Sequence, residues 1–318
     1  MTTPDVPSPP SPDPSEPRRA GFVALIGEPN AGKSTLTNAL VGARVSIVTH
    51  KVQTTRARIR GVAMDGAAQI VLVDTPGLFE PRRRLDRAMV AAAWGGAADA
   101  DIVVLLVEAH RGLTEGVARI LERLHEHAAT RPVVLAINKI DRVKAESLLA
   151  LTQDLNARFD FVRTFLISAE KGHGVADLRL WLGANLPQGP WLYPEDQIAD
   201  LPLRMIAAEM TREKCILRLH EELPYQLTVE TEAWEERKDG SVRIDQVIYV
   251  AREGHRGIVL GRKGATVKAI GQAARAEIAA FLERPVHLFL QVRLRPNWQE
   301  EKERYSEMGL DWRDGAER

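Results

Sequence analysis

The stretch Gly27-Glu28-Pro29-Asn30-Ala31-Gly32-Lys33-Ser34 follows a short apolar run, Phe22-Val23-Ala24-Leu25-Ile26, and precedes a helical stretch over residues 33–40. A strand, a glycine-containing loop and a helix in this order form the setting of the Walker A pattern. Glycines let backbone N–H groups wrap around phosphate, Lys33 places a positive charge against the β- and γ-phosphates, and the Ser34 hydroxyl is a ligand for Mg²⁺. We therefore predict that residues 27–35, with Thr35 as the last, bind nucleotide phosphates; the alternative is a tight turn with an exposed lysine.

Further apolar runs of strand length alternate with helical stretches along the first 190 residues. The runs are Ile70–Val73, Ile102–Val107, Val133–Ile137 and Phe165–Ile167, and the helical stretches include Gly116–His127 and Ala145–Phe159. Continuous apolar strands that alternate with helices indicate a parallel sheet covered on both faces. The sequence therefore predicts an α/β domain with a mostly parallel sheet, whose strands end in polar, glycine-bearing loops at the edge where such sheets bind ligands.

The segment Asp74-Thr75-Pro76-Gly77 stands at the end of one of these strands. A carboxylate in that place can hold the Mg²⁺ shell through water, and the Gly77 N–H can meet the γ-phosphate. An aspartate at a strand end is by itself more often a turn former. Its position downstream of a phosphate-binding loop, at the next strand, is what favours the functional interpretation.

A second loop, Asn138-Lys139-Ile140-Asp141, decides which base is bound. Guanine offers N1–H and a 2-amino group on one edge, and the Asp141 carboxylate can accept both, while the Lys139 stem can lie over the ring. Adenine has neither donor and would leave a desolvated carboxylate unpaired. Ser168-Ala169-Glu170 follows the next strand and is expected to close over the base through backbone groups, so we predict a guanine site at Asn138, Lys139, Asp141, Ser168 and Ala169.

The chain has 318 residues, enough for two domains, and its 43 basic and 43 acidic residues give zero formal net charge. Any contact with nucleic acid must therefore come from a local patch. The single cysteine, Cys215, excludes an intrachain disulfide and suits a reducing cytoplasm. We find no long apolar run and no secretory signal, so we expect a cytoplasmic protein.

Composition divides the chain into five parts. Residues 1–19 are proline-rich and predict a disordered tail. Residues 20–187 form the first domain, and prolines and glycines within 188–200 mark a linker. Residues 201–300 predict a smaller α+β domain in the order helix–strand–strand–helix–helix–strand, and 301–318 form a C-terminal tail. The predicted elements of this domain are 203–219, 226–234, 242–250, 265–282 and 286–294, with Asp239-Gly240 as the turn between the first two strands.

The second domain contains Gly261-Arg262-Lys263-Gly264 between two helical stretches. Two glycines let the backbone approach a nucleic-acid backbone and two cations meet its phosphates, and Lys268 lies nearby. A glycine–x–x–glycine pattern is weak evidence, and Gly254 to Gly257 fits it too. We prefer the second copy because helices flank it and both central residues are basic; a plain helix–helix turn is the alternative.

The four nucleotide motifs resemble those of the translation-factor-like GTPases in order and approximate spacing. This resemblance implies a switch threonine, which would be Thr55 or Thr54 in Gln53-Thr54-Thr55-Arg56, and implies that Thr55 binds Mg²⁺ together with Ser34 and Asp74. Switch II would comprise residues 74–78. Leu78 stands where Ras-like switches have a glutamine, so the chain resembles the subgroup with a hydrophobic residue there, which often recruits K⁺ through the asparagine that is Asn30 here.

The element order and the Gly261–Gly264 loop resemble a type II KH domain. A GTPase joined to such a domain resembles the Era family of bacterial ribosome-assembly GTPases over about residues 20–300, including Glu222-Leu223-Pro224-Tyr225 and Asn297-Trp298. The resemblance implies a GTP- and GDP-binding monomer that hydrolyses GTP, binds 16S ribosomal RNA and the 30S subunit, acts in its assembly and rRNA maturation, and associates peripherally with the cell membrane. An RNA-binding protein whose nucleotide site is only structural is the competing hypothesis.

Overall fold

The computed structural model describes residues 17–49, 59–81, 83–127, 131–195, 197–199, 202–220, 223–302, 305, 308 and 310–316. These residues divide into two compact units. Unit 1 holds the described residues up to Ser46, those from 59 to 199, and those from Tyr305 onward; unit 2 holds residues 47–49 and those from 202 to 302. Residues 1–16 of the predicted Pro-rich tail lie outside the described residues, and Arg19, its last predicted residue, is the first residue of the first strand.

Unit 1 is built on a six-stranded sheet with the order β2-β3-β1-β4-β5-β6. All neighbouring strands are parallel except β2, which pairs antiparallel with β3. The four central strands, β3, β1, β4 and β5, consist mainly of apolar residues that are buried on both faces, which is why they form a covered parallel sheet. The strands are β1 (Arg19–Gly27), β2 (Ile59–Asp65), β3 (Ala68–Asp74), β4 (Ile102–Glu108), β5 (Val133–Asn138) and β6 (Arg163–Leu166).

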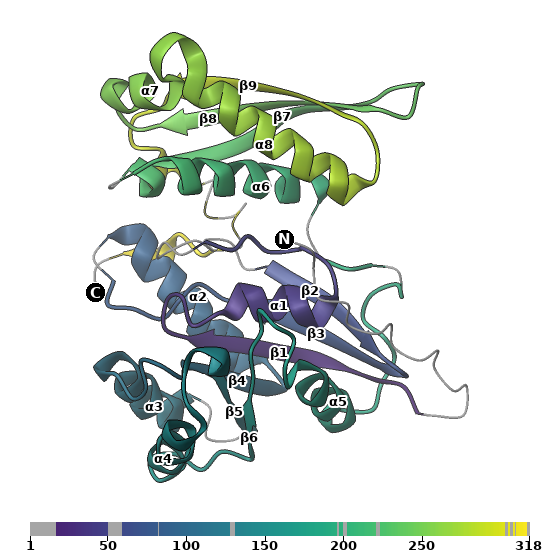
Figure 1. The fold of residues 1–318 in the computed structure, drawn as a ribbon, viewed down its shortest axis with the longest axis vertical. Coiled ribbons are helices and arrows are strands. Elements are labelled where there is room, and N and C mark those ends of the chain that lie inside the picture. The colour runs from purple at the N-terminus through teal and green to yellow at the C-terminus, as the bar shows by residue number, and fades with distance from the viewer. Residues whose placement is uncertain are drawn as a thin grey trace. The chain divides into compact units, whose positions relative to one another are not determined.

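Helices cover the two faces of this sheet, as Figure 1 shows. One buried cluster joins the sheet to three helices, α2 (Arg84–Asp99), α3 (Glu115–His127) and α4 (Ala145–Asn156). The other joins it to α1 (Lys33–Val41) and α5 (Val175–Asn185). The predicted α/β class with a mostly parallel sheet is confirmed, and the carboxyl ends of β1, β3, β4 and β5 bring their following loops to one edge of the sheet.

The segment that we expected to be a linker, residues 188–200, is attached to the outer part of this sheet where it is described. Gln69 is fully buried on β3; its side-chain nitrogen donates to the Tyr193 carbonyl at 2.8 Å, and its side-chain oxygen accepts from the Leu192 and Tyr193 N–H groups. Trp191 donates its indole N–H to the Ala67 carbonyl at 2.9 Å. These bonds fix the described part of the segment on unit 1.

Unit 2 contains a three-stranded sheet in the order β7-β8-β9, with β7 antiparallel and β9 parallel to β8. Its apolar face packs against helices α6 and α8 around a cluster that includes Ile248, Ile270 and the buried thiol Cys215. Burial raises the pKa of Cys215 to about 12, so the thiol is uncharged and behaves as a small apolar group. The elements are α6 (Leu203–Arg218), β7 (Leu227–Glu236), β8 (Val242–Val250), α7 (Glu253–Leu260), α8 (Ala265–Leu282) and β9 (Val286–Leu294).

Trp298, a residue on which the family resemblance rests, follows the last strand of this domain. Trp298 is completely buried and donates its indole N–H to the Gln226 carbonyl at 3.3 Å. The segment after the last strand is thereby joined to the start of the first strand.

Among the described helices, none is both long enough and apolar enough to cross a membrane.

The described part of the C-terminal tail packs onto α2 of unit 1, which the sequence did not predict. Tyr305 and Leu310 are buried with Leu85 and Met89 of that helix. The Arg84 guanidinium lies 3.5 Å from the centre of the Trp312 ring. Arg84 also donates to the Trp312 carbonyl at 3.2 Å, and Arg87 donates to that of Gly315 at 3.1 Å. Residues beyond the second domain therefore complete the apolar cover of a helix in the first.

A Trp312→Ala variant is expected to weaken this attachment by about 2 kcal/mol, because it removes an aromatic cation–π partner and a partly buried ring that packs edge-on against Tyr305. Hydrogen exchange measured by mass spectrometry should show faster exchange in α2 and in the tail. Arg313→Ala is the matched control, since the Arg313 side chain is 88% exposed and pairs only with Asp311 among the described residues. Unchanged exchange in α2 of the Trp312 variant would contradict this account of the tail.

Candidate functional site

The loop between β1 and α1 has the backbone shape that an anion-binding loop requires. Asn30 and Gly32 have positive φ angles of 67° and 101°. A Cβ added to Gly32 would lie 2.2 Å from the Asn138 side-chain nitrogen, and one added to Gly27 would lie 2.5 Å from the Leu106 carbonyl oxygen. A side chain at either position would clash with a neighbouring residue, so both positions require glycine. Helix α1 begins directly after Gly32, at Lys33. The N-terminus of a helix and the preceding N–H groups favour a bound anion at this point.

Lys33 is almost fully buried beneath this loop. Its ammonium donates to the carbonyls of Gly27 and Glu28 at 3.0 Å each. Burial lowers the pKa of Lys33 to about 8, although the nearby carboxylates of Asp74, Glu28 and Glu108 act in the opposite direction. A buried ammonium whose hydrogen bonds within the described residues go to neutral carbonyls gains strongly from an approaching anion.

Asp74 lies at the end of β3 next to Ser34, as the sequence analysis predicted for two ligands of one cation. Asp74 is completely buried, and its Oδ2 atom accepts hydrogen bonds from the Ser34 hydroxyl at 2.8 Å and the Ser46 hydroxyl at 2.7 Å. Its Oδ1 atom is buried and has no hydrogen-bond partner among the described residues. Burial raises the pKa of Asp74, against the effect of the two hydroxyls and of Lys33.

The residues after Asp74 are fixed against the phosphate loop. The Thr75 hydroxyl donates to the Leu25 carbonyl at 2.6 Å, and the Leu78 N–H donates to the Gly27 carbonyl at 2.9 Å. A Cβ added to Gly77 would lie 2.8 Å from Pro29 Cα, so the two loops touch. The Leu78 side chain is buried in the apolar cluster beneath α2 and α3.

Asn138 joins three loops of the site. Its side-chain nitrogen donates to the Ala31 carbonyl in the phosphate loop at 2.8 Å. Its side-chain oxygen accepts the N–H of Lys139 at 2.8 Å and that of Ala169 at 3.0 Å. Because the side chain is only 2% exposed, these bonds are shielded from water. The sequence predicted Asn138 as a site residue but not this role as the connection between loops.

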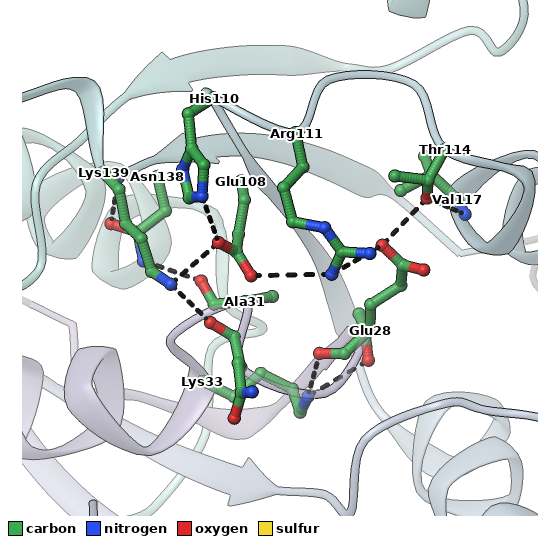
Figure 2. A network of polar contacts seen from close by, with 12 residues as sticks. Glu28, Ala31, Lys33, Glu108, His110, Arg111, Thr114, Val117, Asn138 and Lys139 are labelled. Atoms are coloured by element: carbon green, nitrogen blue, oxygen red, sulfur yellow. Dashed lines mark hydrogen bonds and ion pairs between the residues drawn. The ribbon is translucent and has the colours of Figure 1, made fainter. Parts of the chain in front are cut away.

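Lys139 and Asp141 stand beside the same junction. Lys139 has a φ of 63°, and its ammonium donates to the Asn30 carbonyl at 2.7 Å and to the Glu108 carboxylate at 2.9 Å (Figure 2). Asp141 is exposed and accepts the Ser168 hydroxyl at 2.5 Å, and this hydrogen bond is the main cause of its lowered pKa. Asp141 is therefore a carboxylate at neutral pH, with its charge available at the edge of the sheet.

Sequence reasoning missed two polar residues of this site. Ser46 has no motif around it; it reaches Asp74 because Asn38 on α1 accepts the backbone N–H groups of Val45 and Ser46 with its side-chain oxygen. Glu108 ends β4, and a strand-end carboxylate was the one available signal. The predicted switch threonines Thr54 and Thr55 lie outside the described residues.

The Gly261–Gly264 loop joins α7 to α8 in unit 2. Gly261, Lys263 and Gly264 have positive φ angles of 71°, 52° and 76°, so the backbone turns sharply there. Arg262, Lys263 and Lys268 are exposed, and the described residues supply no ion pair to any of the three. The rival pair, Gly254 and Gly257, lies inside helix α7, where it cannot form a loop.

Comparisons with known proteins agree with both halves of this description. Residues 22–139 match a family model described as a 50S ribosome-binding GTPase, and residues 222–299 match a KH domain model. The chain is 78% identical over 300 residues to GTPase Era of Dinoroseobacter shibae, which covers 94% of this chain and 97% of that protein. It is 62% identical to GTPase Era of Brucella suis over 92% of this chain and 94% of that one.

A crystal structure of Era in complex with MgGDPNP and nucleotides 1506–1542 of 16S ribosomal RNA superposes with a TM-score of 0.86 at 36% identity, covering 92% of this chain and 99% of that chain. The structure of Aquifex aeolicus Era Y63A bound to GDP·AlF4⁻ gives the same values. The matches to the two curated relatives each cover more than nine tenths of this chain. The chain, which joins a P-loop GTPase domain to a KH domain, therefore belongs to the Era family of GTPases.

Proposed function

We propose that this chain is a GTP-hydrolysing switch that binds 16S ribosomal RNA and acts in assembly of the small ribosomal subunit and in rRNA maturation. The observation that carries the nucleotide part is the pair of hydrogen bonds from Asn138 to Ala31 and from Lys139 to Asn30. These bonds hold the loop with a guanine-reading carboxylate beside the loop with phosphate-binding geometry. A guanine nucleotide can span the two loops, with its base at Asp141 and its phosphates at Lys33.

The phosphate loop supplies the electrostatic part of hydrolysis in this proposal. Lys33 exchanges its carbonyl partners for phosphate oxygens, and the N–H groups of residues 27–35 stabilise charge on the transferring phosphoryl group. We expect the Gly77 N–H to meet the γ-phosphate; the contact of Gly77 with Pro29 in the phosphate loop supports this. Positioning and charge stabilisation perform the reaction, and no covalent intermediate with the protein is needed.

The residues around Asp74 fit a magnesium ion. A fully buried carboxylate with an oxygen that lacks a hydrogen-bond partner among the described residues, beside the Ser34 hydroxyl, is a set of hard oxygen donors. In the proposal Ser34 is a direct ligand, Asp74 acts through water, and Thr55 joins them when γ-phosphate is present. Bound Mg²⁺ supplies positive charge that neutralises the phosphate oxygens.

Leu78 sets the expected speed of the reaction. Leucine neither donates nor accepts a hydrogen bond, so it cannot orient the attacking water as a glutamine does. We infer slow intrinsic hydrolysis, which suits a switch. The use of K⁺ through Asn30, a monomeric state, a cytoplasmic location and peripheral membrane association are further predictions from the family resemblance.

The RNA part of the proposal rests on the Gly261–Gly264 loop. Exposed cations on a sharply turned backbone suit contact with RNA phosphates, and a KH loop of this kind clamps a single strand. A related Era protein has been crystallised with a segment of 16S ribosomal RNA, which favours that RNA as the target here. We propose Gly261, Arg262, Lys263, Gly264 and Lys268 as the RNA-contacting residues.

Crosslinking to total cellular RNA tests the combined proposal. The full chain is loaded with a non-hydrolysable GTP analogue or with GDP, crosslinked, and the bound RNA is sequenced. Enrichment of 16S RNA that differs between the two nucleotide states supports a switch. Equal enrichment in both states favours the alternative, an RNA-binding protein with a structural nucleotide site. Competition by ATP as effective as by GTP would instead point to a P-loop ATPase or small-molecule kinase.

Replacing both loop cations, Arg262→Glu with Lys263→Glu, is expected to weaken RNA binding at least about tenfold in low salt. The slope of log affinity against log salt concentration is expected to become shallower by roughly two. Fluorescence anisotropy with a single-stranded RNA from the enriched region measures the affinity. The matched control is Arg237→Glu with Lys238→Glu, which makes the same charge change at exposed residues of the β7–β8 turn. An equal loss in the two double variants would mean that only overall charge matters, and no loss would remove the loop from the RNA site.

A further inference from the structure

Glu108 is a nearly buried carboxylate that none of the sequence motifs contains. It is the last residue of β4, and its side chain is 7% exposed. Figure 2 shows it at the centre of a polar network between the β4–α3 loop and the two loops of the nucleotide site. A charged group in such a place needs partners, and the cationic side chains of Lys139 and Arg111 and the imidazole of His110 surround it.

The shortest of these contacts is with Lys139. The Lys139 ammonium lies 2.9 Å from Glu108 Oε2 and 2.7 Å from the Asn30 carbonyl oxygen. Two acceptors, one at the end of β4 and one in the phosphate loop, fix the end of the lysine side chain, which is otherwise a flexible four-carbon stem. The stem position is therefore set by the carboxylate on one side and by the phosphate loop on the other.

The other contacts hold Glu108 itself in place. His110 Nε2 lies 3.3 Å from the same carboxylate oxygen, and Arg111 Nη1 lies 3.9 Å from the second one. Arg111 also lies 3.7 Å from the Glu28 carboxylate in the phosphate loop. The Glu28 carboxylate in turn accepts a hydrogen bond from the Thr114 hydroxyl at 2.9 Å. The Thr114 hydroxyl oxygen accepts the Val117 N–H in the first turn of α3.

We propose that Glu108 is a positioning residue for guanine-nucleotide binding, which acts by holding the Lys139 side chain where its stem covers the base. The inference rests on the proposed function, because it needs a guanine ring beside Lys139. Glu108 itself touches neither base nor phosphate. It contributes to affinity through Lys139, while Asp141 reads the donors on the guanine edge and gives selectivity.

A purely structural role for Glu108 predicts something different. If the carboxylate only neutralises the cations of the β4–α3 loop, its loss lowers the stability of unit 1 and affects nucleotide binding equally whether or not Lys139 is present. A positioning role predicts that the effect on binding disappears once the Lys139 side chain is removed. A double-mutant cycle separates the two.

The experiment measures GDP and IDP affinity by calorimetry for the full chain, for Glu108→Gln, for Lys139→Ala and for the double variant. Glu108→Gln should weaken GDP binding about tenfold, the loss expected from one charge-assisted hydrogen bond. In the Lys139→Ala variant, the same Glu108→Gln change should weaken GDP binding by less than about twofold. The ratio of GDP to IDP affinity should stay unchanged, because the two bases differ only in the 2-amino group that Asp141 reads.

Glu115→Gln is the matched control, since that carboxylate is 95% exposed at the start of α3 and should leave GDP affinity unchanged. The inference would be overturned if Glu108→Gln weakened GDP binding equally with and without the Lys139 side chain, or if it did not weaken GDP binding when Lys139 is present. If Glu108→Gln does not fold, Glu108→Asp, which keeps the charge on a shorter side chain, is carried through the same cycle under the same criteria. Absence of GDP binding by the unaltered chain would overturn the proposed function and this inference together, which is distinguishable from a failed cycle.

Discussion

An Asp141→Asn variant is expected to bind guanine nucleotides about 10³-fold more weakly than the unaltered chain and to prefer xanthine nucleotides instead. Asp141 is exposed at the edge of the sheet, and its carboxylate is held by the Ser168 hydroxyl. In the proposed complex it accepts two hydrogen bonds, from guanine N1–H and from the 2-amino group. Each is worth about 1.5–3 kcal/mol because the acceptor is charged.

Asparagine keeps the hydrogen bond with N1–H but replaces the acceptor for the 2-amino group with a donor. Its side-chain oxygen still accepts from N1–H, but its amide nitrogen faces the 2-amino group, donor against donor. Xanthine carries a carbonyl oxygen in place of that amino group, so it pairs with both atoms of the asparagine. The prediction is therefore a change of preference and not only a loss of binding, which a general disturbance of the loop would not produce.

Calorimetry with GDP and XDP measures both affinities without interference from hydrolysis. Asp154→Asn, which makes the same substitution at an exposed position of α4, is the control and should leave the GDP affinity unchanged. If Asp141→Asn kept full GDP affinity and gained none for XDP, the base would not lie at Asp141. The proposed function would then lose its specificity for guanine.

The sequence predicted the central strands and the loops that follow them because these depend on local pattern. The predicted apolar runs Ile102–Val107 and Val133–Ile137 form β4 and β5, and each strand extends one residue further, to Glu108 and to Asn138. In unit 2, β8, α8 and β9 have the bounds that the sequence predicted, since alternation and helical periodicity continue to their ends. The proximity of Asn138 to the phosphate loop followed from parallel topology alone.

Elements that depend on distant partners were not predictable in the same way. β2 has a glycine in its middle and an arginine beside it, and it becomes a strand because β3 offers it an antiparallel edge. α2 is rich in alanine and glycine, and it is completed by Tyr305 and Leu310 from the far end of the chain. Ser46 and Glu108 join the site through folded geometry, for which no residue spacing gives a signal.

A Lys33→Ala variant is expected to show no measurable GTP hydrolysis, a loss of about 10³-fold or more in the single-turnover rate. Lys33 is the side-chain cation that the structure buries beneath the phosphate loop, with its ammonium 3.0 Å from the Gly27 and Glu28 carbonyls. Lys33 is the first residue of α1, and it is only 6% exposed. Alanine removes the charge but keeps a good helix former at the first position of α1.

Single-turnover measurements with excess protein, GTP and Mg²⁺ give the rate, and Lys238→Ala on the exposed β7–β8 turn is the control. RNA binding by the nucleotide-free Lys33→Ala variant should equal that of the unaltered chain, because the loop at Gly261–Gly264 belongs to a separately packed unit. Hydrolysis at the unaltered rate would mean that the buried ammonium is structural. Charge on the transferring phosphoryl group would then be stabilised by the loop amides and by other groups, and the electrostatic role given to Lys33 would be wrong.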